Sequence, residues 1–122
     1  MFFACGLFYY FKAEQVKALF LAMKERFPGG CIIFDTAGKA ALKMMIKSVV
    51  ENSAGIEGVD VYFHAGDPKK DIVPWIGDAR VTYKGYMLGY NDLRMPGVSG
   101  MFRLLSKIGD GPMRIKIVKI GF

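Results

Sequence analysis

Few side chains in this sequence of 122 residues have the types and spacing that catalysis requires. His64 is the only histidine, and the sequence identifies no carboxylate that would orient it as a general base, so a structural role is favoured. No serine or cysteine occupies the strand-turn-helix context of an activated nucleophile. Cys5, Cys31 and one histidine also lack the spacing of metal ligands. The sequence therefore identifies neither a catalytic residue nor a metal site.

The turn after the first apolar segment bears on nucleotide binding. A βαβ chain that binds a nucleotide by itself is expected to carry a glycine-rich turn there, so that the backbone can approach the phosphates. The turn in this sequence is Tyr9-Tyr10-Phe11-Lys12. The phosphate-binding motif is therefore missing at this position.

The remaining site candidates lie near the ends of two predicted strands. Cys5 and Gly6 stand where α/β folds bind ligands, and the alternative is a buried thiol beside a packing glycine. Tyr9 and Tyr10 would either line an acceptor pocket or contribute rings to the core. Asp35 would either face an active cleft or cap the helix that follows it.

Alternating strand and helix patterns position these residues. Phe2 to Tyr10 is continuously apolar, which predicts a strand that is buried on both faces of a parallel sheet. Apolar residues recur at three- and four-residue spacing from Ala13 to Phe27, which predicts an amphipathic helix that ends at a proline-glycine turn. Cys31 to Phe34 is a second apolar strand. The three elements form a right-handed βαβ unit with parallel strands.

The rest of the chain predicts a further helix and terminal strands. Lys39 to Asn52 has helical periodicity, and Arg80 to Leu88 has the composition of a strand. Asp71 to Trp75 and Met101 to Ile108 are candidate helical segments, and the alternation from Met113 to Ile117 is typical of a strand near a sheet edge. The predicted outer stripe of the first of these helices is a solvated basic face formed by Lys39, Lys43 and Lys47.

Composition indicates one α/β domain over residues 1–122, since 52% of the residues are apolar, 23% are charged and the net charge is +6. The basic residues are spread without a nucleic-acid motif, so nucleic-acid binding is not expected. The apolar opening, Met1 to Phe11, is too short to span a membrane and lacks the charge pattern of a signal peptide. We therefore expect a cytoplasmic location and reduced core thiols at Cys5 and Cys31.

Residues 6 to 35 contain the segments GLFYYF, AEQVKALF and RFPGGCIIFD in that order. This order resembles the middle of S-adenosylmethionine-dependent O-methyltransferases of the leucine carboxyl methyltransferase and tetracenomycin polyketide O-methyltransferase type. The resemblance continues in Asp67-Pro68 and Trp75, before the last strands, and in the final segment Met113 to Phe122. For Trp75 itself, a packing anchor is favoured over a stacking platform. The resemblance covers most of the chain, with a weaker part between Asn91 and Gly109.

The resemblance implies the C-terminal half of a Rossmann-like class I methyltransferase sheet. The implied cofactor is S-adenosylmethionine and the implied acceptor is a hydroxyl or carboxyl oxygen of a small molecule. Cys5 and Gly6 would lie beside the cofactor, with Tyr9, Tyr10 and Asp35 in the acceptor pocket. The family's glycine-rich cofactor motif would precede the residues present here, which implies a fragment or degenerate relative that is inactive alone. Family members usually carry glutamate where this chain has Cys5, and a thiol does not replace a carboxylate as a charge partner.

A different class of function also fits the sequence, a non-catalytic module that associates with itself or with a separately encoded first half. In the complete fold the strand from Phe2 to Tyr10 would be central, so its outer edge lacks a partner in this chain. An exposed apolar edge favours pairing with another chain. We therefore expect a homodimer through residues 2–10.

Overall fold

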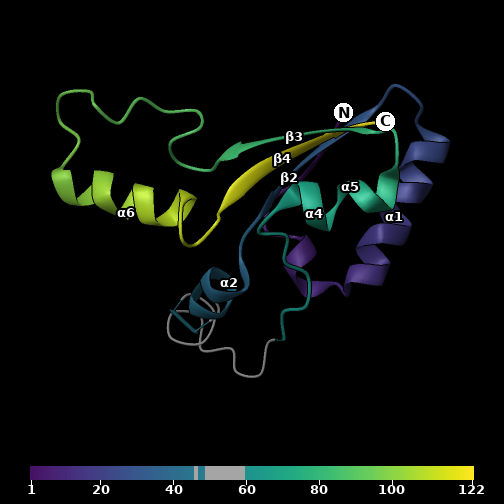
Figure 1. Ribbon diagram of the computed structural model, residues 1–122, viewed down its shortest axis with the longest axis horizontal. Helices are drawn as coiled ribbons and strands as arrows, with labels where there is room; N and C mark the ends of the chain where they lie inside the picture. The colour runs from purple at the N-terminus through teal and green to yellow at the C-terminus, as the bar shows by residue number, and fades with distance from the viewer. Residues whose placement is uncertain (46, 49–59) are drawn as a thin grey trace.

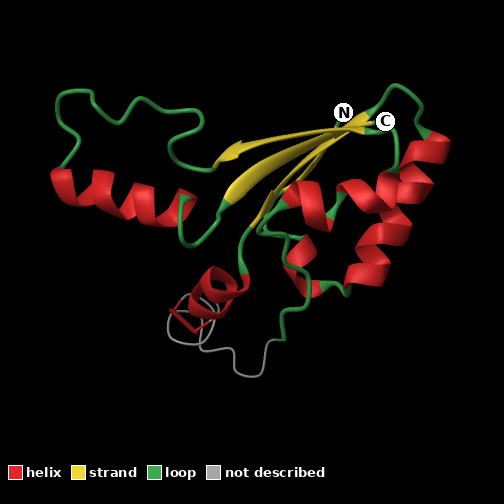
Figure 2. Ribbon diagram, in the orientation of Figure 1, coloured by secondary structure: helices red, strands yellow, loops and turns green. Residues whose placement is uncertain are grey.

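The computed structural model describes residues 1–45, 47–48 and 60–122, which form a mixed α/β fold (Figures 1 and 2). The α/β class is therefore confirmed. In chain order the elements are β1 (Phe2–Ala4), the 3-10 helix η1 (Phe8–Tyr10), α1 (Ala13–Arg26), β2 (Cys31–Thr36), α2 (Lys39–Met45), α4 (Pro68–Asp71), α5 (Val73–Ile76), β3 (Arg80–Gly85), α6 (Gly100–Asp110) and β4 (Lys116–Gly121).

The described strands form one sheet with the order β1-β2-β4-β3. β1 and β2 are parallel and α1 connects them, as the predicted βαβ unit requires. β4 runs antiparallel to both of its neighbours, β2 and β3, so the last strand lies near the edge of the sheet, next to β3, and is not itself the edge strand. β4 begins later than predicted, because Arg114 has a positive φ of 54° and the chain turns there.

The first strand is shorter and more exposed than predicted. β1 ends at Ala4, and residues 8–10 form η1 in place of a continuing strand. Gly6 has a φ of 64°, a left-handed conformation that glycine adopts readily and that interrupts an extended chain. Phe3 is 70% exposed, so burial on both faces does not hold for this chain.

The helix α1 confirms the predicted amphipathic segment. At its start the side chain of Gln15 accepts a hydrogen bond of 2.8 Å from the backbone N–H of Lys12. The buried residues of α1 follow helical spacing and are Val16, Phe20 and Met23. The turn after α1 is fastened to the other end of the chain, since the N–H of Gly29 donates to the carbonyl of Phe122 at 3.0 Å.

The main core lies on one side of the sheet, where α1, α4 and α5 are seen together (Figure 1). Three phenylalanine rings are at its centre: the Phe8 centroid is 5.4 Å from that of Phe20 and 5.2 Å from that of Phe34. On the opposite face a row across the sheet contains Phe3, Thr82 and Lys119, and all three are exposed. The described helices therefore cover one face of the sheet and leave this row open.

The second half of the chain departs from its predicted boundaries. α2 confirms the start of the helix predicted over Lys39 to Asn52, and residue 46 and residues 49–59 lie outside the described part. β3 ends at Gly85, before the predicted Leu88: the N–H of Tyr86 donates to the carbonyl of Ile115 at 3.1 Å, and the carboxylate of Asp110 then accepts the N–H groups of Met87 and Leu88 at 2.9 and 2.6 Å. The segment Asp71 to Trp75, predicted as one helical turn, is divided between α4 and α5.

The helix α6 contains the predicted segment Met101 to Ile108. Its hydroxyl cap is Ser99, which accepts a hydrogen bond of 3.2 Å from the N–H of Phe102. The apolar side chains of α6 face solvent, and Met101 is 74% exposed. None of the helices in the described ranges is long and apolar enough to span a bilayer.

Candidate functional site

The carboxyl ends of the parallel strands β1 and β2 bring together most of the residues that the sequence singled out. Asp35 near the end of β2 accepts two hydrogen bonds with its carboxylate. One comes from the backbone N–H of Gly6 at 2.6 Å, and the other from the hydroxyl of Tyr9 at 2.7 Å. Cys5 is close enough that its thiol interacts with the same carboxylate. We refer to Cys5, Gly6, Tyr9 and Asp35 as the Asp35 cluster.

Local backbone geometry explains why these residues meet. The parallel register pairs Ala4 with Phe34, so the residues that follow Ala4 pass beside Asp35. The left-handed conformation of Gly6 lets its N–H point to Asp35, and η1 then places Tyr9 on the other carboxylate oxygen. The cluster is thus a consequence of the early end of β1, which the sequence pattern did not reveal.

The charge of Asp35 controls the acidity of its neighbours. It raises the pKa of the Cys5 thiol, and partial burial and a hydrogen bond to Asp35 add to that effect. Burial raises the pKa of Tyr9 far above its usual range, and the hydrogen bond to Asp35 raises it further. Both groups therefore keep their protons at neutral pH. A cysteine that acts as a nucleophile needs the opposite shift, so Cys5 is not activated here.

The open alternatives of the sequence are resolved for several residues. Tyr9 is a buried ring with a hydrogen-bonded hydroxyl, whereas Tyr10 is 49% exposed and donates neither of the hydrogen bonds that Asp35 accepts from Gly6 and Tyr9. Asp35 holds the segment after β1, and its oxygens bind there rather than at the start of α2. Both cysteines are free thiols, but Cys5 is exposed and Cys31 is only half-buried, so neither is the core residue that the sequence predicted.

His64 and Trp75 lie outside the Asp35 cluster. Trp75 packs against the core, with its ring centroid 5.9 Å from that of Phe63, which agrees with a packing anchor. His64 is exposed on the segment that leads to Ala65, and that segment is held to β2 because Thr36 accepts the N–H of Ala65 at 3.0 Å. No group of three potential metal ligands forms among residues 1–45, 47–48 and 60–122.

A cavity that the sequence did not predict lies beside the Asp35 cluster. It has a volume of about 380 Å³, and its lining includes His64 together with Lys12 and Tyr62. Lys39, Lys43 and Lys47 are exposed, as predicted for a solvated basic face, and the first two also line this cavity. Lys12 and Tyr62 line the cavity from the side opposite that stripe, and the sequence has no local signal for this arrangement.

Comparison with protein-family models, with curated proteins and with solved structures finds no match to this chain. The functional conclusion is therefore drawn from the geometry of the site and from the resemblance in residues 6 to 35.

Proposed function

We propose that this chain is the C-terminal half of an S-adenosylmethionine-dependent O-methyltransferase or a degenerate relative of one, and that it is inactive alone. The observation that carries the proposal is the Asp35 cluster at the carboxyl ends of β1 and β2. Ligands of α/β sheets bind at this end of parallel strands. Three residues that the resemblance assigns to the cofactor and acceptor sites, Gly6, Tyr9 and Asp35, are in direct contact there.

The order of elements supports the same proposal. The strand, helix and FPGG turn of the resemblance correspond to β1, α1 and the turn before β2, which ends just after Asp35. Asp67 and Pro68 begin α4, and Trp75 lies in α5, before the last two strands. The finer assignment to a class I methyltransferase sheet belongs to this proposal.

The residues present fit only part of the cofactor. Both oxygens of Asp35 are engaged by Gly6 and Tyr9, and Cys5 offers a neutral thiol where a charged acceptor would be useful. No glycine-rich turn follows β1. The rate enhancement of methyl transfer comes largely from holding the two reactants in line, and these residues do not hold both reactants. We therefore derive no catalytic step from this chain.

A titration calorimetry experiment tests the proposal in two arms. In the first, S-adenosylmethionine is added to the chain alone, and we expect no binding tighter than about 1 mM. In the second, it is added to the chain co-expressed with the polypeptide encoded by the reading frame immediately upstream, where we expect a glycine-rich strand-turn-helix. Binding about 100-fold tighter is expected there. Tight binding by the chain alone would overturn the claim of inactivity, and no binding in either arm would overturn the proposal that the chain is half of a working methyltransferase.

A second candidate function is self-association without catalysis. β1 lies at the edge of the sheet, and the large apolar side chains exposed around it are Met1, Phe2, Phe3, Leu7, Tyr10 and Phe11. Unpaired edge strands with apolar side chains favour pairing with a second copy. This observation favours a homodimer through residues 2–10.

Light scattering over a dilution series tests the dimer. We expect the mass of two chains at micromolar concentration and a shift to monomer in the variant Phe3→Lys, because a charged edge disfavours strand pairing. The matched control is Leu19→Lys, an exposed apolar residue on α1, which should leave the mass unchanged. A wild-type monomer throughout the series would exclude this function.

A further inference from the structure

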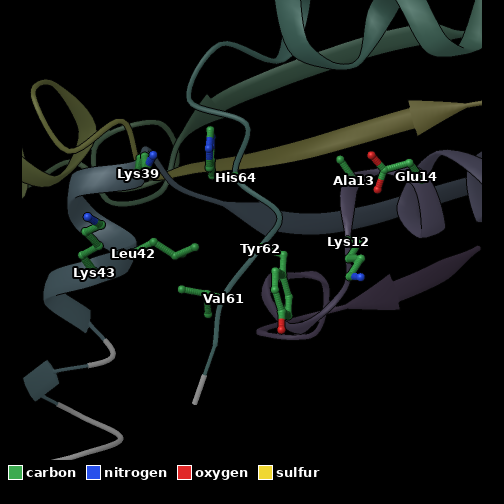
Figure 3. A pocket seen from close by; sticks show the side chains of 9 residues that line it. All are labelled: Lys12, Ala13, Glu14, Lys39, Leu42, Lys43, Val61, Tyr62 and His64. Atoms are coloured by element: carbon green, nitrogen blue, oxygen red, sulfur yellow. The ribbon is translucent and has the colours of Figure 1, made fainter. Parts of the chain in front are cut away.

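The cavity beside the Asp35 cluster lies between α2 and the start of α1, and the proposed function does not use it (Figure 3). Its volume of about 380 Å³ falls within the range of small-molecule sites. Sites of this size combine an apolar floor with a few polar groups that determine orientation. Both features are present here.

The floor of the cavity is apolar and held in place. Leu42 is 2% exposed, and its N–H donates to the carbonyl of Gly38 at 3.0 Å. Val61 faces Leu42 from the neighbouring segment (Figure 3). That segment is anchored because the N–H of Tyr62 donates to the carbonyl of Tyr9 at 2.9 Å. A ligand with an apolar body would therefore meet a preformed surface.

The rim of the cavity is basic. Lys39 and Lys43 are one helical turn apart on α2, and Lys12 enters from the opposite side, just before α1 (Figure 3). Among the described residues that line the cavity, Glu14 is the one acidic residue. In the described part of the chain the ion pairs are those of Lys24 with Asp78 and Arg94 with Asp92, so none of the three rim lysines belongs to one.

An adjoining cavity of about 530 Å³ helps to locate the anion-binding position. It shares Lys39 and His64 with the first cavity and adds Lys70 and Arg114. Two aspartates line it as well, so its positive charges are largely balanced. Its lining is also more polar, since Leu42 and Val61 do not contribute to it. Compared with this neighbour, the first cavity has the larger excess of positive charge and an apolar floor.

We propose that the first cavity binds a small organic anion. The apolar body of this ligand packs on Leu42 and Val61, its phosphate or carboxylate group is held by Lys39 and Lys43 on α2, and Lys12 adds positive charge from the opposite side of the cavity. Lysine ammonium groups bind both kinds of anion as point charges, and an anion relieves their mutual repulsion. The inference does not depend on methyl transfer, because it rests on the cavity and its charges.

Binding of phenyl phosphate, followed by NMR of the backbone amides, tests the proposal. We expect the amides of Leu42, Val61 and Tyr62 to shift with a Kd of about 1 mM or tighter. Benzyl alcohol, which lacks the charge, and inorganic phosphate, which lacks the apolar body, should bind at least about tenfold more weakly. The affinity for benzoate, measured in the same way, compares a carboxylate with a phosphate as the anionic group of the ligand. Equal binding of benzyl alcohol would overturn the anion site.

A double variant, Lys39→Gln with Lys43→Gln, tests the role of the rim. Both side chains are exposed, so the fold should be retained, and the affinity for phenyl phosphate should fall about tenfold. Lys17→Gln is the matched control, an exposed lysine of α1 outside both cavities, and should not change the affinity. For the wild type, added salt should weaken binding. Affinity that is unchanged in the double variant and insensitive to salt would contradict the proposal.

Discussion

Substitution of Phe20 by alanine is expected to lower the free energy of unfolding by about 3–5 kcal/mol, the usual cost of removing a buried aromatic ring. Phe20 is 0% exposed, and its ring lies 5.3 Å from that of Phe34 and 5.4 Å from that of Phe8. The residues around the new cavity come from α1, β2 and η1, which cannot collapse without moving the sheet. The free energy of unfolding of a domain is usually about 5–15 kcal/mol, so this loss is a large part of the total stability. Denaturation by urea measures it.

The same helix offers a matched control. Leu19 is adjacent to Phe20 but exposed, so Leu19→Ala should change the free energy of unfolding by less than about 0.5 kcal/mol. The difference between the two variants reports which face of α1 is buried. Equal effects would show that α1 does not pack against the sheet in the observed orientation.

The elements that the sequence predicted correctly are those whose residues have a strong local pattern. The periodicity of α1 and the apolar run of β2 correctly predicted a βαβ unit, because a single buried face imposes a period that neighbouring residues reveal. The opening segment misled because its apolar run is continuous. Gly6 divides that run into β1 and η1, and a positive φ at one glycine has no signature in the hydrophobic pattern.

The order of the strands was the harder problem. Alternating charges in the last segment indicated a strand near an edge, and β4 lies next to the edge strand β3 but pairs with both β2 and β3. Lys119 is nevertheless exposed, because the face on which it lies is the open face of the sheet. Lys116, by contrast, lies on the covered face with Val118 and Ile120, so the predicted charged face does not report which side of the sheet is uncovered. Nor does it report whether the strand has one neighbour or two.

The candidate site could be predicted only as separate residues. Cys5, Gly6, Tyr9 and Asp35 were each singled out because they end predicted strands, and the contacts among them depend on the turn at Gly6. The cavity beside them depends on pairs far apart in the sequence, such as Lys12 with Lys39. Single-sequence patterns describe neighbours along the chain, so neither set of contacts was accessible to them.

Tyr9 is expected to make the protein less stable at alkaline pH, with an onset near the ordinary tyrosine pKa of about 10. Burial and the hydrogen bond to Asp35 raise the pKa of Tyr9 in the folded state. Below about pH 10 both states keep the proton, and the stabilisation is fully present. Above that pH the unfolded chain loses the proton while the folded chain keeps it. The free energy of unfolding should then fall by about 1.4 kcal/mol per pH unit from this group.

Tyr9→Phe isolates this contribution, because lysines that titrate in the same range are common to both proteins. At about pH 8 the variant should be less stable than the wild type by about 1–2 kcal/mol, since Asp35 loses a hydrogen-bond donor. The free energies of unfolding of wild type and variant should converge above about pH 10. There the wild type alone is destabilised, because its unfolded chain loses the proton of residue 9 and its folded chain keeps it. Tyr10→Phe is the control, because that side chain is exposed. A constant difference between wild type and Tyr9→Phe at every pH would show that the Tyr9 hydroxyl ionises as freely in the folded protein as in the unfolded chain, and the Asp35 cluster would then not be formed as described.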